Sequence, residues 1–94
     1  MKINLTGKLI VEGYYSEYAD YFGWTHEGLE EDDLIKYVID LDKGVMDIYV
    51  YRNGRWVPYV YEGVEYTNIR DEDTIKTHLR EFLKLLSESE EVEF

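Results

Sequence analysis

The sequence predicts an α+β fold, in which an antiparallel β-sheet of about four strands packs against one C-terminal α-helix. Two observations carry this prediction. Residues 34–61 hold three runs of β-branched and aromatic side chains separated by turn residues, and residues 71–86 place apolar side chains at helical spacing. The 94 residues suit a single domain, 1–94, with one core.

The first strand is predicted over residues 3–11. Apolar residues alternate there with polar ones, at the period of two that is typical of a half-buried strand. The apolar positions are Ile3, Leu5, Leu9 and Val11. Gly7 weakens the pattern and is expected to mark a bulge.

Residues 12–33 form a segment that we call the acidic aromatic segment. It carries eight carboxylates, six Tyr, Phe or Trp rings, and no Lys or Arg. Within it, Ser16 can cap a short helix that Gly23 ends, with Tyr18, Tyr21 and Phe22 on one face. An irregular loop fits residues 14–30 nearly as well, so both alternatives remain open.

A meander of three strands is predicted at residues 34–41, 45–51 and 55–61. The dipeptide Asn53-Gly54 is a strong signal for a two-residue hairpin turn. Such a turn sets the pairs Arg52 with Arg55, Tyr51 with Trp56, Val50 with Val57, and Tyr49 with Pro58. Pro58 then points its missing N–H away from the partner strand, so the third strand is expected at a sheet edge.

The turn Asp42-Lys43-Gly44 is expected to be three residues long, so that Leu41 opposes Val45. This register places on one face Ile35, Tyr37, Ile39, Leu41, Val45, Tyr49, Tyr51, Trp56 and Val60. The reverse face then holds Val38, Met46, Ile48, Val50, Val57, Tyr59 and Tyr61, with Lys36 and Asp40. Both faces are apolar, and a single helix can cover only one of them.

The C-terminal helix is predicted to begin at a cap at or near Asp71. Acidic residues in its first turn favour the positive end of the helix dipole. Its apolar stripe is formed by Ile75, His78, Leu79, Phe82, Leu83 and Leu86. The acidic tail at residues 87–94 is expected to fray.

Charge limits the class of partner. The chain has 21 acidic and 10 basic residues, a formal net charge of −11, which disfavours direct binding of nucleic acid and favours a basic protein. Cysteine is absent, so disulfides and thiolate chemistry are excluded. Lys8 interrupts the first apolar residues before a signal core forms, and no run is long enough to span a membrane. We therefore expect a cytoplasmic protein without membrane contact.

Few residues offer catalytic or metal chemistry. A Ser-His-Asp arrangement is very poorly supported, and His26 with His78 is the remaining acid–base pair, which defines a small-enzyme alternative. Residues 40–44 start like a calcium loop but lack its later ligands, so neither a metal nor a cofactor is expected. Arg52 and Arg55 oppose each other as like charges, which indicates a weak anion site for a carboxylate or phosphate.

The preferred hypothesis is a non-enzymatic binding protein that inhibits a basic, nucleic-acid-handling target. In size and charge, the chain resembles the small acidic inhibitors that phages direct against host defence nucleases, which include anti-CRISPR proteins and DNA mimics, and also resembles acidic toxin-immunity proteins. This resemblance covers no motif. The predicted partner-binding residues are Glu17, Asp20, Glu30, Glu31, Asp32 and Asp33, with Tyr18, Tyr21 and Trp24 as aromatic anchors. The alternative is a homodimer formed through an apolar sheet face or the Pro58 edge.

Overall fold

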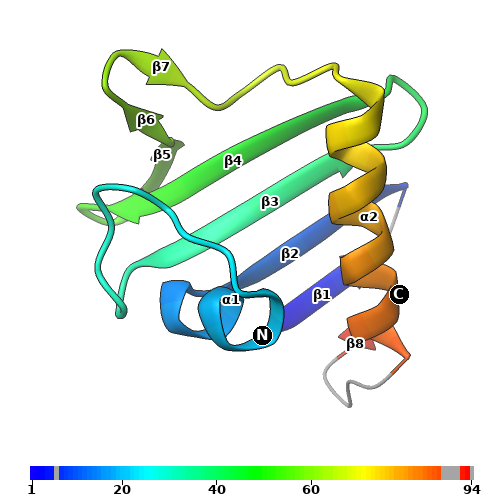
Figure 1. Cartoon of the computed structure of the whole chain (residues 1–94), viewed down its shortest axis with the longest axis horizontal. Helices are drawn as coiled ribbons and strands as arrows, with labels where there is room; N and C mark the ends of the chain where they lie inside the picture. Colours follow the sequence, from blue (N-terminus) through cyan, green and yellow to red (C-terminus); the bar gives the residue numbers. More distant parts are fainter. Residues whose placement is uncertain (6, 88–91, 94) are drawn as a thin grey trace.

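The computed structural model describes residues 1–5, 7–87 and 92–93, and shows an α+β fold. Six strands form one sheet in the order β5-β4-β3-β2-β1-β8, and helix α2 crosses one face of it (Figure 1). Five of these strands are antiparallel neighbours, slightly more than the four expected. The elements are β1 Lys2–Leu5, β2 Lys8–Tyr14, α1 Tyr15–Phe22, β3 Leu34–Asp40, β4 Val45–Arg52, β5 Arg55–Pro58, β6 Val60–Tyr61, β7 Val64–Glu65, α2 Glu72–Leu86 and β8 Val92–Glu93.

The predicted single strand at 3–11 is a hairpin of β1 and β2. Gly7 has a φ of 90°, a conformation that glycine adopts without a Cβ penalty, and the chain reverses there instead of bulging. Ile3 opposes Val11 and Leu5 opposes Leu9. The alternation of apolar residues continues through the turn, which explains why the pattern resembled one strand.

The Asn53-Gly54 hairpin has the predicted register. All four expected pairs are present, from Arg52 with Arg55 to Tyr49 with Pro58. Asn53 and Gly54 both have positive φ, as a two-residue turn of the primed type requires. β5 lies at the end of the sheet order, so Pro58 is on an edge strand as predicted. The predicted strand 55–61 is too long, however, because β5 ends at Pro58 and β6 pairs with β7 in a separate two-stranded sheet.

The predicted register between the first and second of the central strands is wrong by one residue. Asp40, and not Leu41, opposes Val45. The Asp40 carboxylate accepts hydrogen bonds from the backbone N–H groups of Asp42 and Lys43, both at 3.1 Å, and this starts the turn one residue earlier. A slip of one residue moves side chains to the opposite face. The predicted division into faces is therefore also wrong.

In the observed register, one face of the sheet is the core. Its residues on β3 and β4 are Ile35, Tyr37, Ile39, Met46, Ile48 and Val50, all of them buried. The opposite face is half-buried and mixes apolar with charged side chains. There the Lys36 ammonium group lies 4.4 Å from the centroid of the Trp56 ring.

Helix α2 begins at the predicted cap, since Asp71 accepts a hydrogen bond from the Thr74 N–H at 3.2 Å. Phe82 and Ile75 are buried against the sheet, whereas Leu83 of the predicted stripe is 45 % exposed. Only the Leu86 side chain of that stripe lies outside the described part. The expected frayed tail contains β8, which pairs in parallel with β1, while residues 88–91 and 94 lie outside the described residues.

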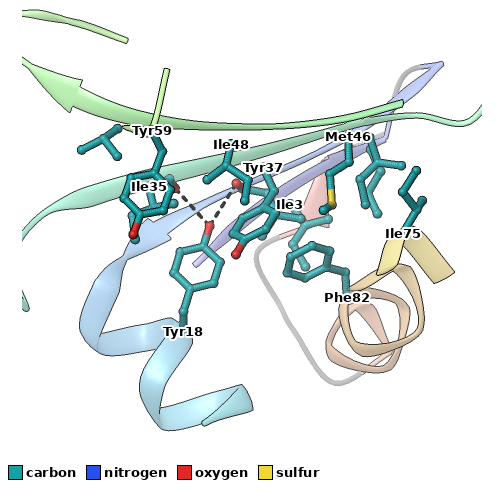
Figure 2. Close-up of a cluster of buried hydrophobic side chains, with 13 residues drawn as sticks. Ile3, Tyr18, Ile35, Tyr37, Met46, Ile48, Tyr59, Ile75 and Phe82 are labelled. Carbon is teal, nitrogen blue, oxygen red and sulfur yellow. Dashed lines mark hydrogen bonds between the residues drawn. The ribbon is translucent and has the colours of Figure 1, made fainter. Parts of the chain in front are cut away.

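Helix α1 ends at Gly23 as the helical alternative required, with Gly23 in the left-handed region. Its N-terminal hydrogen bond comes from Glu17 instead of Ser16: the Tyr14 N–H donates to Glu17 Oε1 at 3.0 Å. Tyr18 of this helix is fully buried. Its hydroxyl lies 3.1 Å from the Val11 carbonyl and 3.0 Å from the Ile35 carbonyl, so it joins α1 to β2 and β3 (Figure 2).

Replacing Tyr18 with Phe should lower the free energy of unfolding by about 1–2 kcal/mol, because the buried hydroxyl contacts are lost while the ring is kept. Urea denaturation of the two proteins measures the difference. Tyr21→Phe on the same helix is the control, because Tyr21 is 60 % exposed and should tolerate the change. Equal losses in both variants would contradict the anchoring role of Tyr18.

Candidate functional site

Four of the six predicted acidic residues, at positions 30–33, lie in a turn of the chain at residues 27–33, which we call the acidic turn. Glu27, Glu30, Glu31 and Asp32 are exposed on it. The end of the turn is held against α1, because the N–H groups of Tyr15 and Ser16 donate to the carbonyls of Asp33 and Glu31 at 2.8 and 3.1 Å. These bonds also satisfy donors at the helix start.

Asp33 differs from its acidic neighbours because it is engaged within the protein. Arg52 donates to both of its carboxylate oxygens, at 2.6 and 3.2 Å, and the Glu30 N–H donates at 2.7 Å. Partial burial raises the pKa of Asp33, but these bonds outweigh it and hold the pKa below its ordinary value. Arg52 thus grips a carboxylate of its own chain, which offsets its repulsion with Arg55. Arg55 is exposed.

The remaining predicted residues of α1 have different surroundings. Asp20 and Tyr21 are exposed on the helix. Glu17 is half-buried, forms an ion pair with the amino group of Met1 and accepts a hydrogen bond from the Tyr14 N–H. Its position indicates a role in holding α1 to the sheet.

The structure corrects the expectation for Tyr18 and Trp24 as surface anchors. Tyr18 is fully buried, and Trp24 is partly buried against other rings. Its ring centroid lies 4.4 Å from that of Phe22 and 4.6 Å from that of His78. The six rings of the acidic aromatic segment therefore divide. Tyr14 and Tyr21 are exposed, Tyr18 is buried in the core, and Tyr15, Phe22 and Trp24 are partly buried against it.

The two histidines that the sequence paired as the small-enzyme alternative, His26 and His78, both line one pocket. Its volume is about 480 Å³. The loop after α1 contributes Trp24 and His26, β3 contributes Tyr37, and α2 contributes His78. The helical stripe had placed His78 toward the core, but His26 follows α1 in an irregular loop for which no periodic pattern exists.

Each histidine forms a hydrogen bond within the protein. His26 Nε2 lies 2.7 Å from the Tyr37 hydroxyl, and His78 Nδ1 donates to the Thr74 carbonyl at 2.8 Å. Burial, followed by the nearby His78, lowers the pKa of His26 to about 4. Burial also lowers the pKa of His78, and its backbone hydrogen bond offsets this only in part. Burial thus disfavours the protonated, charged form of both imidazoles.

Across the described residues, no three His, Cys, Asp or Glu side chains are grouped to hold a metal ion. Neither described helix has the length and apolarity that crossing a bilayer requires. No protein-family model, curated protein or solved structure matches the chain.

Arg52→Met should lower the free energy of unfolding by about 1 kcal/mol at pH 7, a modest figure because the arginine is 41 % exposed. The pKa of Asp33 is depressed in the folded state, so this contribution exists above pH ~4 and disappears as the pH falls through the folded pKa. Urea denaturation at several pH values measures it. Arg55→Met is the matched control and should show no such pH-dependent loss.

His26 should destabilise the protein as the pH falls from about 6.5 to about 4. Its pKa is lower in the folded than in the unfolded state, so acid favours the unfolded chain. Between pH 7 and pH 5 this amounts to up to about 2 kcal/mol. Comparing wild type with His26→Gln cancels the carboxylates common to both, and parallel pH curves for the two proteins would contradict the prediction.

Proposed function

We propose that the protein is a small, non-enzymatic inhibitor of a basic, nucleic-acid-handling protein in the cytoplasm of a bacterial or phage-infected cell. The observation that carries this proposal is the acidic turn, where three consecutive carboxylates are exposed on an ordered backbone. These are Glu30, Glu31 and Asp32. The turn would occupy the cationic surface with which the target holds phosphates.

The order of the turn favours this use. Its backbone is tied to α1 by the Asp33 and Glu31 carbonyls and to β4 by the bonds between Asp33 and Arg52. A contact surface that is already ordered loses less conformational entropy when a partner binds. Asp33 then acts as a support for the turn, while its three neighbours carry the contact charge.

Exposed tyrosines supply the second part of the surface. Tyr14 is 51 % exposed and pairs with Leu34, the residue after the acidic turn. Tyr21 is 60 % exposed on α1. Tyrosine combines a large apolar ring with a hydrogen-bonding hydroxyl, and it is enriched at binding hot spots. In the proposal, Tyr14 and Tyr21 therefore take the anchoring part that Tyr18 and Trp24 cannot.

The triple variant Glu30→Gln, Glu31→Gln and Asp32→Asn should lose partners that the wild type captures from a bacterial lysate. The matched control is Asp42→Asn, Glu62→Gln and Glu81→Gln, which makes the same charge change outside the acidic turn. Both variants raise the formal net charge of −11 by three, to −8. Only the first should lose binding by tenfold or more, since it removes the contact charges.

Two further measurements define the mode of binding. Capture by the wild type should weaken steeply as salt rises from about 50 to about 500 mM, and duplex DNA should displace the partner. Equal losses in the two triple variants, or a captured partner that DNA does not displace, would contradict the proposal. A dimer held by an apolar sheet face would instead give a concentration-dependent mass that salt barely changes.

A further inference from the structure

The face of the main sheet that points away from the core is not covered by either described helix. Tyr18 of α1 and Phe82 of α2 both contact the Tyr37 ring, so both helices pack on the core face (Figure 2). We call the opposite side of strands β1 to β5 the open face. Its side chains are half-buried or exposed, and none is buried. They are the alternate residues of each strand that begin at Lys2, Lys8, Leu34, Val45 and Trp56.

The open face is electrically neutral in a strongly acidic protein. Three lysines and three carboxylates project from it: Lys2, Lys8, Lys36, Glu12, Asp40 and Asp47. The formal net charge of −11 therefore belongs to the rest of the chain. A basic protein finds no net attraction at this face, and a nucleic acid finds no basic patch. Two copies of so acidic a chain repel each other, and they repel least where two neutral faces meet.

Strands β2 and β3, at the centre of the sheet order, pair opposite charges across the strands. Lys8 opposes Asp40, and Glu12 opposes Lys36. Each lysine of these two strands therefore has a carboxylate as its cross-strand neighbour, and opposite charges in this position attract. The same pairing determines what the open face presents to another molecule.

This pairing makes the open face complementary to a copy of itself. Two copies can stack face to face about a twofold axis that runs along the strands between β2 and β3. The axis exchanges the two strands, so each residue of β2 faces the second copy's version of its own cross-strand neighbour. Both pairs of opposite charges then also form between the copies. Ile10, which opposes Val38 within the sheet, meets Val38 of the second copy between these charges.

The relief of the open face fits the same arrangement. It is hollowed at β1 and β2, where a depression of about 260 Å³ is lined by Lys2, Asn4, Ile10 and Glu12. The axis places β4 of the second copy over β1, because these strands are the outer neighbours of β3 and β2. Tyr49 of β4 shares a cross-strand row with Lys2 of β1. The Tyr49 ring of the second copy is thus brought to the depression.

We propose that two copies of the protein form a symmetric dimer through their open faces. The overlap of β1 to β4 measures about 19 Å across four strands and about 23 Å along seven residues. As flat surfaces, two such faces bury about 900 Å², which is typical of a weak interface, so the dimer should form at high protein concentration. No residue of the acidic turn belongs to the open face, so this proposal and the inhibitor proposal can fail separately.

Complementary charge swaps test the dimer. Glu12→Lys and Lys36→Glu each set like charges against each other at two symmetric positions, so each variant alone should stay monomeric. An equal mixture of the two variants should dimerise, because the lysines of one face the carboxylates of the other. Sedimentation equilibrium from about 10 µM to about 1 mM should show a mass that rises with concentration for the wild type and for the mixture only.

Glu62→Lys is the matched control, because it makes the same charge change as Glu12→Lys at an exposed residue outside the open face. It should dimerise as the wild type does. A wild type that stays monomeric at about 1 mM would overturn the proposal. Single variants that associate as the wild type does, or a mixture that associates no better than its two components, would also overturn it.

The wild type alone tests the arrangement, should a variant fail to fold. In an equal mixture of ¹³C-labelled and unlabelled protein, isotope-filtered NOEs report only contacts between copies. They should join the methyl groups of Ile10 and Val38. A dimer without these contacts would contradict the proposed interface.

Discussion

Tyr37 is the residue on which three parts of the structure converge. It belongs to β3, and its ring centroid lies 5.4 Å from that of Tyr18 on α1, 5.8 Å from that of Trp24 and 5.2 Å from that of Phe82 on α2. Its hydroxyl bonds to His26. The two helices and the connecting loop thus reach the sheet at one ring, and the core and the pocket share this ring as a common wall.

Packing around Tyr37 places the carboxylates and the aromatic rings of the acidic aromatic segment in different environments. In the acidic aromatic segment, carboxylates and rings alternate closely, but folding sends most of the apolar rings inward and leaves Glu30, Glu31 and Asp32 outside. Burying the rings gives the loop a fixed path. The path in turn places the charges on one turn, so the same aromatic packing that stabilises the core also orders the acidic surface.

Sequence patterns predicted the fold class, the first two central strands, the Asn53-Gly54 register and the cap of α2, because each depends on neighbours along the chain. The third predicted strand, 55–61, is divided after Pro58 between two sheets. The errors have a different physical origin. Asp40 shifted a turn through side-chain hydrogen bonds, which outweigh periodicity and are invisible to it. The sequence did indicate the acidic turn, because residues 30–33 are four consecutive carboxylates. The sequence also paired His26 with His78, but it did not indicate the pocket, because the pocket's other walls come from separate elements that meet only in the folded chain.

The pairing of Tyr14 with Leu34 determines where the acidic aromatic segment can change without disturbing the sheet. Strands β2 and β3 remain paired up to this point, so residues 15–33 form an excursion between two strands that already hold together. Lengthening such an excursion adds little closure entropy. Its buried part, which includes Tyr18 and Trp24, is constrained by the core, whereas its exposed tip at 30–32 is free to diverge. Substitutions at that tip would therefore leave the packing of the sheet and of both helices unchanged.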